Sequence, residues 1–287
     1  MSIVTIKNDF LTVEISTTGA EIKSVKDAKG TEFIWCADPN VWENSAPILF
    51  PVCGALKDEK FTYKGKSYSM EGKHGFARYM EYGVKELTET KAVFSACQTE
   101  ETLKQYPFCF ELEAIYELKE DTLLVKYAVT NNSEDTMYYS IGCHEGYACP
   151  EGIGEYEVVF PKETTLVNHL CEGPLMNGET EIYKENCKVL PLSPEIFEID
   201  SLIFVNSGIY EVELRHKNSS KKITVSFPGF DALLFWQHVG AGYICIEPWK
   251  GLPDYVDCDG DISNKVAILT VEAGKTDVSE HTIRFEG

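Results

Sequence analysis

Short runs of β-branched and aromatic residues, separated by turn residues, recur along almost the whole chain. The first runs are IVTIKN, FLTVEIS, AEIKSV and EFIW, and later ones include ALLFWQ, YICIE and VAILTVEAG. Such runs, with turn signals roughly every 8 to 12 residues, are typical of antiparallel strands. Helical periodicity is confined to TEETLKQYP, which predicts at most a couple of turns. The sequence therefore predicts an all-β fold, an antiparallel β-sandwich or barrel.

Local turn chemistry supports this reading and gives no sign of a domain boundary. In FTYKGKSYSM, Phe61 and Tyr63 alternate across a turn at Gly65 from Tyr68 and Met70, as in a β-hairpin. Proline, glycine and serine never gather into a linker, and no period of roughly 20 to 50 residues repeats. We therefore expect a single domain over residues 1–287.

The charge balance excludes two classes of partner. The chain has 46 acidic and 26 basic residues, a formal net charge of -20, which repels nucleic-acid phosphates and anionic lipid headgroups. The N-terminal MSIVTIKNDF does not look like a secretion signal, and no window approaches the roughly 18 apolar residues of a membrane span. We expect a cytoplasmic protein that binds neither nucleic acid nor membranes.

Ten cysteines are distributed sparsely over the chain, and several stand inside strand-like apolar runs, including Cys97, Cys109, Cys143 and Cys245. Free core thiols explain this pattern better than a disulfide framework. There is no CxxC pair, and no cysteine and histidine pattern has structural-zinc spacing. The sequence predicts no metal site.

Two histidines are flanked by glycines. His74 precedes Gly75 in MEGKHGFARYMEY, which also holds Arg78, and His144 lies in YSIGCHEGYACP after an apolar strand. Glycine permits close approach of the backbone to a ligand. For His74, the alternative to a functional role is an ordinary loop histidine beside a surface arginine. For His144, it is a structural histidine hydrogen-bonded to the backbone. Adjacent Cys143 does not suit a Cys-His pair, because consecutive strand residues point to opposite faces.

An acidic residue ends the apolar run of YICIEPW. Burying ionised Glu247 without a partner costs several kcal/mol or protonates it, so the position is either solvent-facing or useful. Pro248 cannot donate to a sheet ladder, so we expect the strand to end or bulge there and leave Glu247 at a rim. Asp200 and Asp231 precede apolar runs, where aspartate is often only a turn former.

Glu247 and two histidines would supply a base, an acid and a polarising group for proton transfer without a cofactor. An apolar wall raises a carboxyl pKa toward neutrality, where imidazole already titrates. The aromatic residues Trp249, Trp236, Phe235 and Tyr147 offer flat surfaces that suit sugar rings, although most strand aromatics are core.

Four segments, in order, resemble motifs of the aldose 1-epimerases (galactose mutarotases), in particular of their LacX-like branch. They are PILFPVCGALKDEKFTYKGKSYSMEGKHGFAR, YYSIGCHEGYACP, IDSLIFVN and ICIEPWKGLPD, and the similarity extends to about residue 280. The resemblance implies a large antiparallel β-sandwich, often called a supersandwich. It also implies a cofactor-independent isomerase that interconverts the α and β anomers of a small-molecule sugar.

The matched motifs also imply residue roles. Glu247 would be the base that removes the proton from the sugar O1 hydroxyl, and His144 the acid that protonates the ring oxygen. His74 would form a hydrogen bond beside it, and Asp200 would bind a sugar hydroxyl. Ring opening, rotation about C1-C2 and closure then give the other anomer.

Two positions differ from the family pattern. The histidine strand reads HEGY where the family more often has His-Pro, so Glu145 adds a charge that raises the pKa of His144 if it points inward and does little if it faces solvent. Galactose mutarotases proper have an arginine where this chain has Ala55, and Arg78 is the candidate replacement.

Three other functions compete with a mutarotase of free aldoses. A hexose 6-phosphate could be the substrate, its phosphate bound by Arg78, Lys73 or Lys250. A non-catalytic carbohydrate-binding or sensing protein could use the same sandwich, but would not require His74, His144 and Glu247 together. Glycoside hydrolysis would need a second carboxylate beside Glu247.

Overall fold

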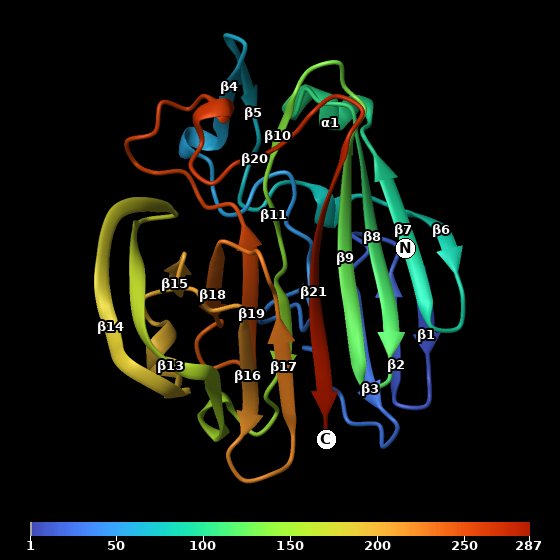
Figure 1. Ribbon diagram of the computed structural model, residues 1–287, viewed down its shortest axis with the longest axis vertical. Coiled ribbons are helices and arrows are strands. Elements are labelled where there is room, and N and C mark those ends of the chain that lie inside the picture. The colour runs from blue at the N-terminus through green and yellow to red at the C-terminus, as the bar shows by residue number, and fades with distance from the viewer. Residues whose placement is uncertain (1) are drawn as a thin grey trace.

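The computed structural model describes residues 2–287 as a fold built mainly of antiparallel strands (Figure 1). The largest sheet has nine strands, in the order β14-β13-β16-β17-β21-β9-β8-β7-β6. Their bounds are β6 Gly83–Leu87, β7 Lys91–Cys97, β8 Phe110–Lys119, β9 Thr122–Asn131, β13 Tyr156–Glu172, β14 Leu175–Pro191, β16 Glu211–His216, β17 Lys222–Ser226 and β21 Thr276–Glu286.

A five-stranded and a three-stranded sheet supply further layers. The first has the order β11-β19-β18-β15, and β12 also pairs with β19; the second has the order β1-β2-β3. The bounds are β11 Ile141–Gly142, β12 Glu145–Ala148, β15 Ser201–Val205, β18 Ala232–Trp236, β19 Tyr243–Lys250, β1 Ile3–Lys7, β2 Leu11–Ser16 and β3 Ile22–Asp27.

Two small two-stranded sheets, one short α-helix and five 3-10 helices complete the described part of the chain. The sheets pair β4 Lys60–Tyr63 with β5 Lys66–Ser69, and β10 Met137–Tyr139 with β20 Leu269–Val271. The helices are α1 Glu100–Gln105, η1 Lys57–Glu59, η2 Ala77–Tyr79, η3 Ile153–Glu155, η4 Pro194–Phe197 and η5 Ile262–Asn264.

The main core lies between the nine-stranded sheet and the other layers. Strand β8 buries every second residue from Phe110 to Leu118, the alternation expected when one face of a sheet packs on a core. The hydroxyl of Tyr116 on β8 donates to the Ala20 carbonyl, which precedes β3, over 2.6 Å. Phe33 and Phe285 also meet across the layers, with ring centroids 5.2 Å apart. The predicted all-β, antiparallel sandwich is confirmed.

Local predictions were right for hairpins and wrong for some strand limits. The hairpin around Gly65 is β4-β5, and TEETLKQYP contains α1, whose first turn is capped by the Thr99 side chain. EFIW is not a strand: only Glu32 and Ile34 form isolated bridges. YEVVF is only the start of β13, which pairs with β14 in a long curved hairpin (Figure 1).

Strand β19 does not end at Pro248, which corrects the sequence prediction. It continues to Lys250 and lies inside the five-stranded sheet, so Glu247 is not at its rim. The interruption falls instead on the neighbouring segment, where β11 ends at Gly142 and β12 begins at Glu145. A proline lacking an N–H is thus accommodated opposite a gap in the ladder.

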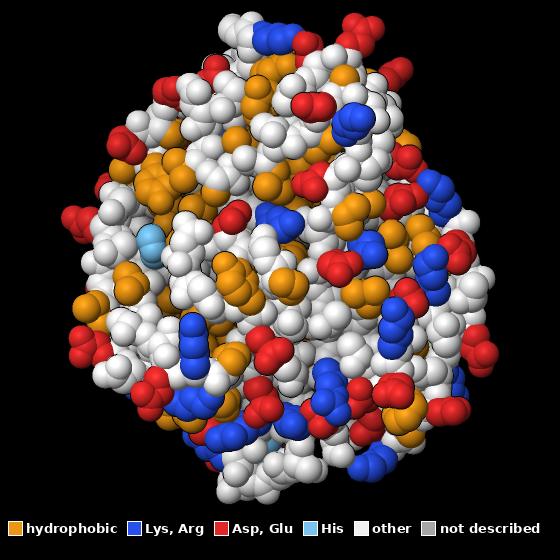
Figure 2. All heavy atoms as spheres, viewed as in Figure 1, with side chains coloured by type: hydrophobic (Ala, Val, Ile, Leu, Met, Phe, Trp, Pro, Cys, Tyr) orange, Lys and Arg blue, Asp and Glu red, His pale blue; other side chains and the backbone are white. Residues whose placement is uncertain are grey.

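All ten cysteines are free, as the sequence predicted, but not all of them lie in the core: Cys97 is exposed and Cys109 is half-buried. No helix within residues 2–287 has the length and apolar character needed to cross a membrane. On the face seen in Figure 2, acidic and basic side chains are interspersed rather than gathered into a basic surface.

Candidate active site

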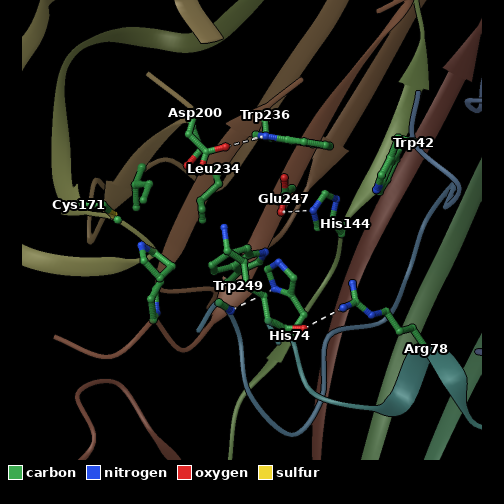
Figure 3. Close-up of a pocket in the computed structure, with 17 residues that line it drawn as sticks. Trp42, His74, Arg78, His144, Cys171, Asp200, Leu234, Trp236, Glu247 and Trp249 are labelled. Carbon is green, nitrogen blue, oxygen red and sulfur yellow. Dashed lines mark hydrogen bonds and ion pairs between the residues drawn. The ribbon is translucent and has the colours of Figure 1, made fainter. Parts of the chain in front are cut away.

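A cavity of about 200 Å³ opens over the five-stranded sheet (Figure 3). This volume is below the roughly 300–1,000 Å³ of drug-sized ligand pockets, so it suits a small ligand. Segments distant in the sequence meet there. The cavity lining includes Trp42, Lys73, His74, Arg78, His144, Cys171, Pro174, Asp200, Trp236, Glu247 and Trp249.

Glu247 and His144 face each other on the cavity floor (Figure 3). The pairings Glu145 with Ile246 and Gly142 with Trp249 share one register, and continuing it through the ladder gap sets His144 opposite Glu247. His144 Nε2 lies 3.3 Å from Glu247 Oε2. Glu247 is only 2% exposed, so the carboxyl group is buried apart from its opening to the cavity.

Burial shifts the two groups toward their neutral forms. It raises the pKa of Glu247 well above its usual value, and the Glu145 and Asp200 carboxylates raise it further. It lowers the pKa of His144 to about 3, with further lowering by the positive charge of Arg78. Because the two groups are in contact, they titrate together, and their opposite pKa shifts favour the form in which Glu247 holds a proton and His144 is neutral.

His74 approaches the pair from the opposite wall, with its ring perpendicular to His144 and the centroids 5.5 Å apart. Its Nδ1 accepts a hydrogen bond from the Gly54 amide over 3.1 Å. Burial lowers the pKa of His74, so the neutral ring carries its proton on Nε2 and can donate it to a ligand. A Cβ on Gly75 would lie 2.3 Å from the Phe50 carbonyl oxygen, so only glycine permits this turn.

Three tryptophans form the walls around His144. The ring centroids of Trp42 and Trp236 lie 5.1 Å and 5.6 Å from that of the His144 imidazole. The ring centroid of Trp249 lies 5.4 Å from that of His74. Gly146 makes room for one of them, because a Cβ there would lie 2.9 Å from the Trp42 ring. The glycine of HEGY therefore accommodates one wall of the cavity.

Asp200 and Arg78 stand at the sides of the cavity (Figure 3). Asp200 accepts a hydrogen bond from Trp236 Nε1 over 2.9 Å, and Arg78 donates from Nη2 to the Lys73 carbonyl over 2.9 Å. Both Asp200 and His74 have positive φ, 82° and 70°. Such non-glycine conformations cost about 1–3 kcal/mol each and cluster at functional sites.

The structure brings together all six residues predicted for the site: Glu247, His144, His74, Arg78, Asp200 and Trp249. Phe235 and Tyr147 are core residues with no exposed surface. Ala55 and Lys250 are not among the lining residues, and the Lys250 ammonium lies over the Phe230 ring.

Sequence reasoning missed Trp42, Cys171 and Pro174. Trp42 comes from an irregular segment in which its only signal was a large aromatic residue among turn residues. Cys171 and Pro174 come from the tip of the β13-β14 hairpin, whose reach over the cavity depends on its length and curvature.

Glu145 follows neither alternative drawn from the sequence. It is 2% exposed and faces away from His144 into the core, where its Oε1 lies 2.9 Å from His281 Nε2. Its charge acts on Glu247 through the sheet, raising the pKa of that carboxyl group.

Two clusters within residues 2–287 have ligand atoms close enough to hold a metal ion. One joins Cys143, Glu145 and His281, and the other joins His144, Cys245 and Glu247. In the first cluster, opposite edges of one imidazole face the thiol and the carboxylate, which suits hydrogen bonds rather than a shared ion. That the protein needs no metal or cofactor stays a prediction.

Comparisons with known proteins agree on one family. The sequence profile described as aldose 1-epimerase matches residues 2–269. The plasmid-encoded LacX protein of Lactococcus lactis subsp. lactis is 32% identical over 282 residues, 93% of this chain and 94% of that protein. A galactose mutarotase related enzyme from Lactobacillus acidophilus superposes with a TM-score of 0.95 at 32% identity, covering 100% of this chain and 98% of the other. A galactose mutarotase-like protein from Lactobacillus casei gives a TM-score of 0.92 at 28% identity, covering 99% and 100%.

Proposed function

The chain belongs to the aldose 1-epimerase family, and on that premise we propose that it is a mutarotase acting on a free aldose. The observation that carries the proposal is the 3.3 Å separation of His144 Nε2 and Glu247 Oε2 on the cavity floor. Mutarotation exchanges protons at O1 and at the ring oxygen, which are both bonded to C1. An acid and a base must therefore be neighbours, each within hydrogen-bond reach of one oxygen.

When the proton of the pair has passed from Glu247 to His144, Glu247 accepts the proton of the O1 hydroxyl while His144 protonates the ring oxygen. The C1 to ring-oxygen bond breaks and leaves an open-chain aldehyde. After rotation about C1-C2 the groups act in reverse: the ring oxygen loses its proton to His144 as it attacks C1, and Glu247 returns a proton to O1. The pair ends with the proton count with which it began.

The remaining residues have binding roles in this proposal. His74 donates from Nε2 toward the ring oxygen, stabilising the charge that develops as the ring opens. Asp200 accepts a hydrogen bond from a sugar hydroxyl, and Arg78, which lines the cavity, supplies the cation that the resemblance to galactose mutarotases implies at the Ala55 position. Trp249 presents an apolar surface of the kind that packs on sugar C–H groups.

The direct test follows freshly dissolved α-glucose and α-galactose by polarimetry or exchange NMR. We expect acceleration for at least one aldose, and loss of it in Glu247→Gln. Failure with every aldose tried, in a folded protein, would overturn the proposal and favour a binding protein, which calorimetry with the same sugars would detect.

A second candidate substrate is a hexose 6-phosphate, favoured by Lys73 and Arg78, which both line the cavity. The test compares turnover of glucose and glucose 6-phosphate by wild type and Lys73→Met. A phosphate-dependent enzyme would prefer glucose 6-phosphate and lose that preference in the variant, whereas a free-aldose enzyme would show neither effect. Lys250→Met is the matched control, because the Lys250 ammonium lies over Phe230 instead.

A further inference from the structure

Three side chains form a buried network behind the cavity floor. Cys143 has no exposed surface, Glu145 is 2% exposed and His281 is 1% exposed. The Cys143 Sγ lies 3.3 Å from His281 Nδ1, and Glu145 Oε1 lies 2.9 Å from His281 Nε2. Because strand residues alternate, the two neighbours of His144 both point away from the cavity and meet the same imidazole.

We propose that Glu145 and His281 are positioning residues for the catalytic pair: His281 fixes both neighbours of His144, and Glu145 places a negative charge behind Glu247. The inference rests on the proposed function, because it assigns the network a task in that reaction. Neither residue reaches the cavity, so neither touches substrate.

The network compensates for the gap in the sheet. Between Gly142 and Glu145 the strand makes no ladder bridges with β19, although the Cys143 amide still donates to the Pro248 carbonyl over 3.0 Å. His144 therefore stands where its backbone has fewer partners than a strand residue normally has. His281 comes from β21 of the opposite sheet and holds this segment from behind.

The hydrogen-bond directions follow from burial. Burial raises the pKa of the Cys143 thiol, so the thiol keeps its proton and can donate it to His281 Nδ1. With Nδ1 accepting from the thiol, the ring proton lies on Nε2 and is donated to Glu145. Glu145 Oε2 has no hydrogen-bond partner among the described residues, so the hydrogen bond from His281 is the one that stabilises this buried carboxylate.

The negative charge of Glu145 raises the pKa of Glu247. A negative charge favours the protonated form of its neighbours, and this carboxylate is the second contributor, after burial, to the raised pKa of Glu247. Removing that charge should lower both macroscopic pKa values of the His144–Glu247 pair.

Other titratable groups surround both carboxyl groups. Those acting with or on Glu145 are His281 of β21, Tyr116 of β8, Tyr127 of β9, Tyr147 of β12, Cys245 of β19 and Cys143 in the gap. Those in electrostatic interaction with Glu247 are His144, Cys245, Cys53, Cys143, Tyr243, Asp200 and Lys73. The phenols and thiols of this set that have shifted pKa values are raised by burial and stay neutral across the working pH range.

The experiment measures kcat and KM against pH for the wild type, Glu145→Gln and His281→Gln. We expect Glu145→Gln to move both limbs of the kcat profile toward lower pH. We expect His281→Gln, which cannot bridge both neighbours of His144, to lower kcat about tenfold with a smaller change in KM, as misplacement of a catalytic group does. Cys143→Ser keeps a donor to Nδ1 and should retain most of the activity.

Tyr147→Phe is the matched control. Tyr147 is on the same strand and face as Glu145, and its buried hydroxyl has no partner among the described residues. Its removal alters a buried polar group without touching His281, so the pH profile should not move. Wild-type kcat and pH profiles in both Glu145→Gln and His281→Gln would overturn the proposal.

A measurement without turnover separates this inference from the proposed function. Carboxyl ¹³C NMR should show Glu247 titrating at lower pH in Glu145→Gln than in wild type, whether or not any sugar is converted. If the variant does not fold, the wild type still serves: a His281 Nε2 proton that is protected from exchange supports the network, and a rapidly exchanging one overturns it. Absence of mutarotation with a shifted Glu247 titration would refute the proposed function alone.

Discussion

Replacing Glu247 by glutamine should have opposite effects on activity and on stability. The amide has nearly the same shape but cannot accept the O1 proton, so the proton-transfer contribution is lost. A positioned general base is worth about 10²–10⁴ in rate, and because Glu247 is buried and already 3.3 Å from its partner, we expect a loss of about 10³. This corresponds to about 4 kcal/mol of transition-state stabilisation.

The stability effect follows from the raised pKa. Below the ordinary pKa of 4.5, Glu247 is protonated in both folded and unfolded states and adds no pH dependence. Above 4.5 the unfolded state releases a proton that the folded state retains, so the wild type loses up to about 1.4 kcal/mol per pH unit until the raised folded-state pKa is reached. Glutamine removes this cost, and the variant should therefore become more stable than wild type as pH rises above 4.5.

Polarimetric turnover and urea unfolding between pH 4 and 8 test both parts. Glu179→Gln is the matched control, because Glu179 is exposed on β14 and should change neither quantity. Turnover within a few-fold of wild type in folded Glu247→Gln would refute the assignment of the base. Equal destabilisation of Glu247→Gln at every pH would refute the claim that burial destabilises the ionised form of the Glu247 carboxyl group.

Three further outcomes are expected. Asp200→Asn should raise KM several-fold with little change in kcat, measured by initial rates, because in the proposed function Asp200 binds substrate, and Trp236 can still donate to the amide oxygen. The pKa of His144 falls from 6.5 to about 3 on folding, so between these pH values only the unfolded state takes up the proton. The free energy of unfolding should therefore decrease as pH falls from 6.5 to about 3. Urea unfolding of His144→Gln should lack this pH-dependent decrease. Lys265→Met should destabilise by about 3–5 kcal/mol in thermal or urea unfolding, because it leaves Asp254, 5% exposed, without its buried partner.

Sequence alone was informative where local chemistry decides the structure. Alternating apolar residues and turn glycines gave the hairpin at Gly65, and the capping pattern around Thr99 is consistent with the one short α-helix described. Glu247 and His144 stood out because burying a carboxyl group or an imidazole among apolar strand residues costs free energy unless a partner offsets it. Such a position therefore indicates a structural partner or a functional role. Their roles came from family resemblance, since spacing along the chain does not determine which strands pair.

What could not be predicted depends on long-range geometry. Trp42 reaches His144 from a segment without periodic pattern, and Cys171 reaches the cavity only because β13 and β14 extend over it. The direction of Glu145 depended on which face of its strand turned inward, and its partner His281 is 136 residues away. No local rule connects residues at that separation.

Pro248 links the local and the long-range aspects of the site. Its missing N–H was expected to end the strand, but β19 continues and the neighbouring segment is interrupted instead. That interruption contains His144, opposite Glu247 by register and 3.3 Å from it. A continuous ladder would hold the segment rigidly through backbone bonds, whereas here the position of His144 depends on side chains: the Trp249 indole donates to the Cys143 carbonyl over 3.2 Å, and His281 contacts both flanking residues. Substitution of His281, in the core behind the sheet, should therefore alter catalysis although it does not line the cavity, with a smaller effect than substitution of Glu247.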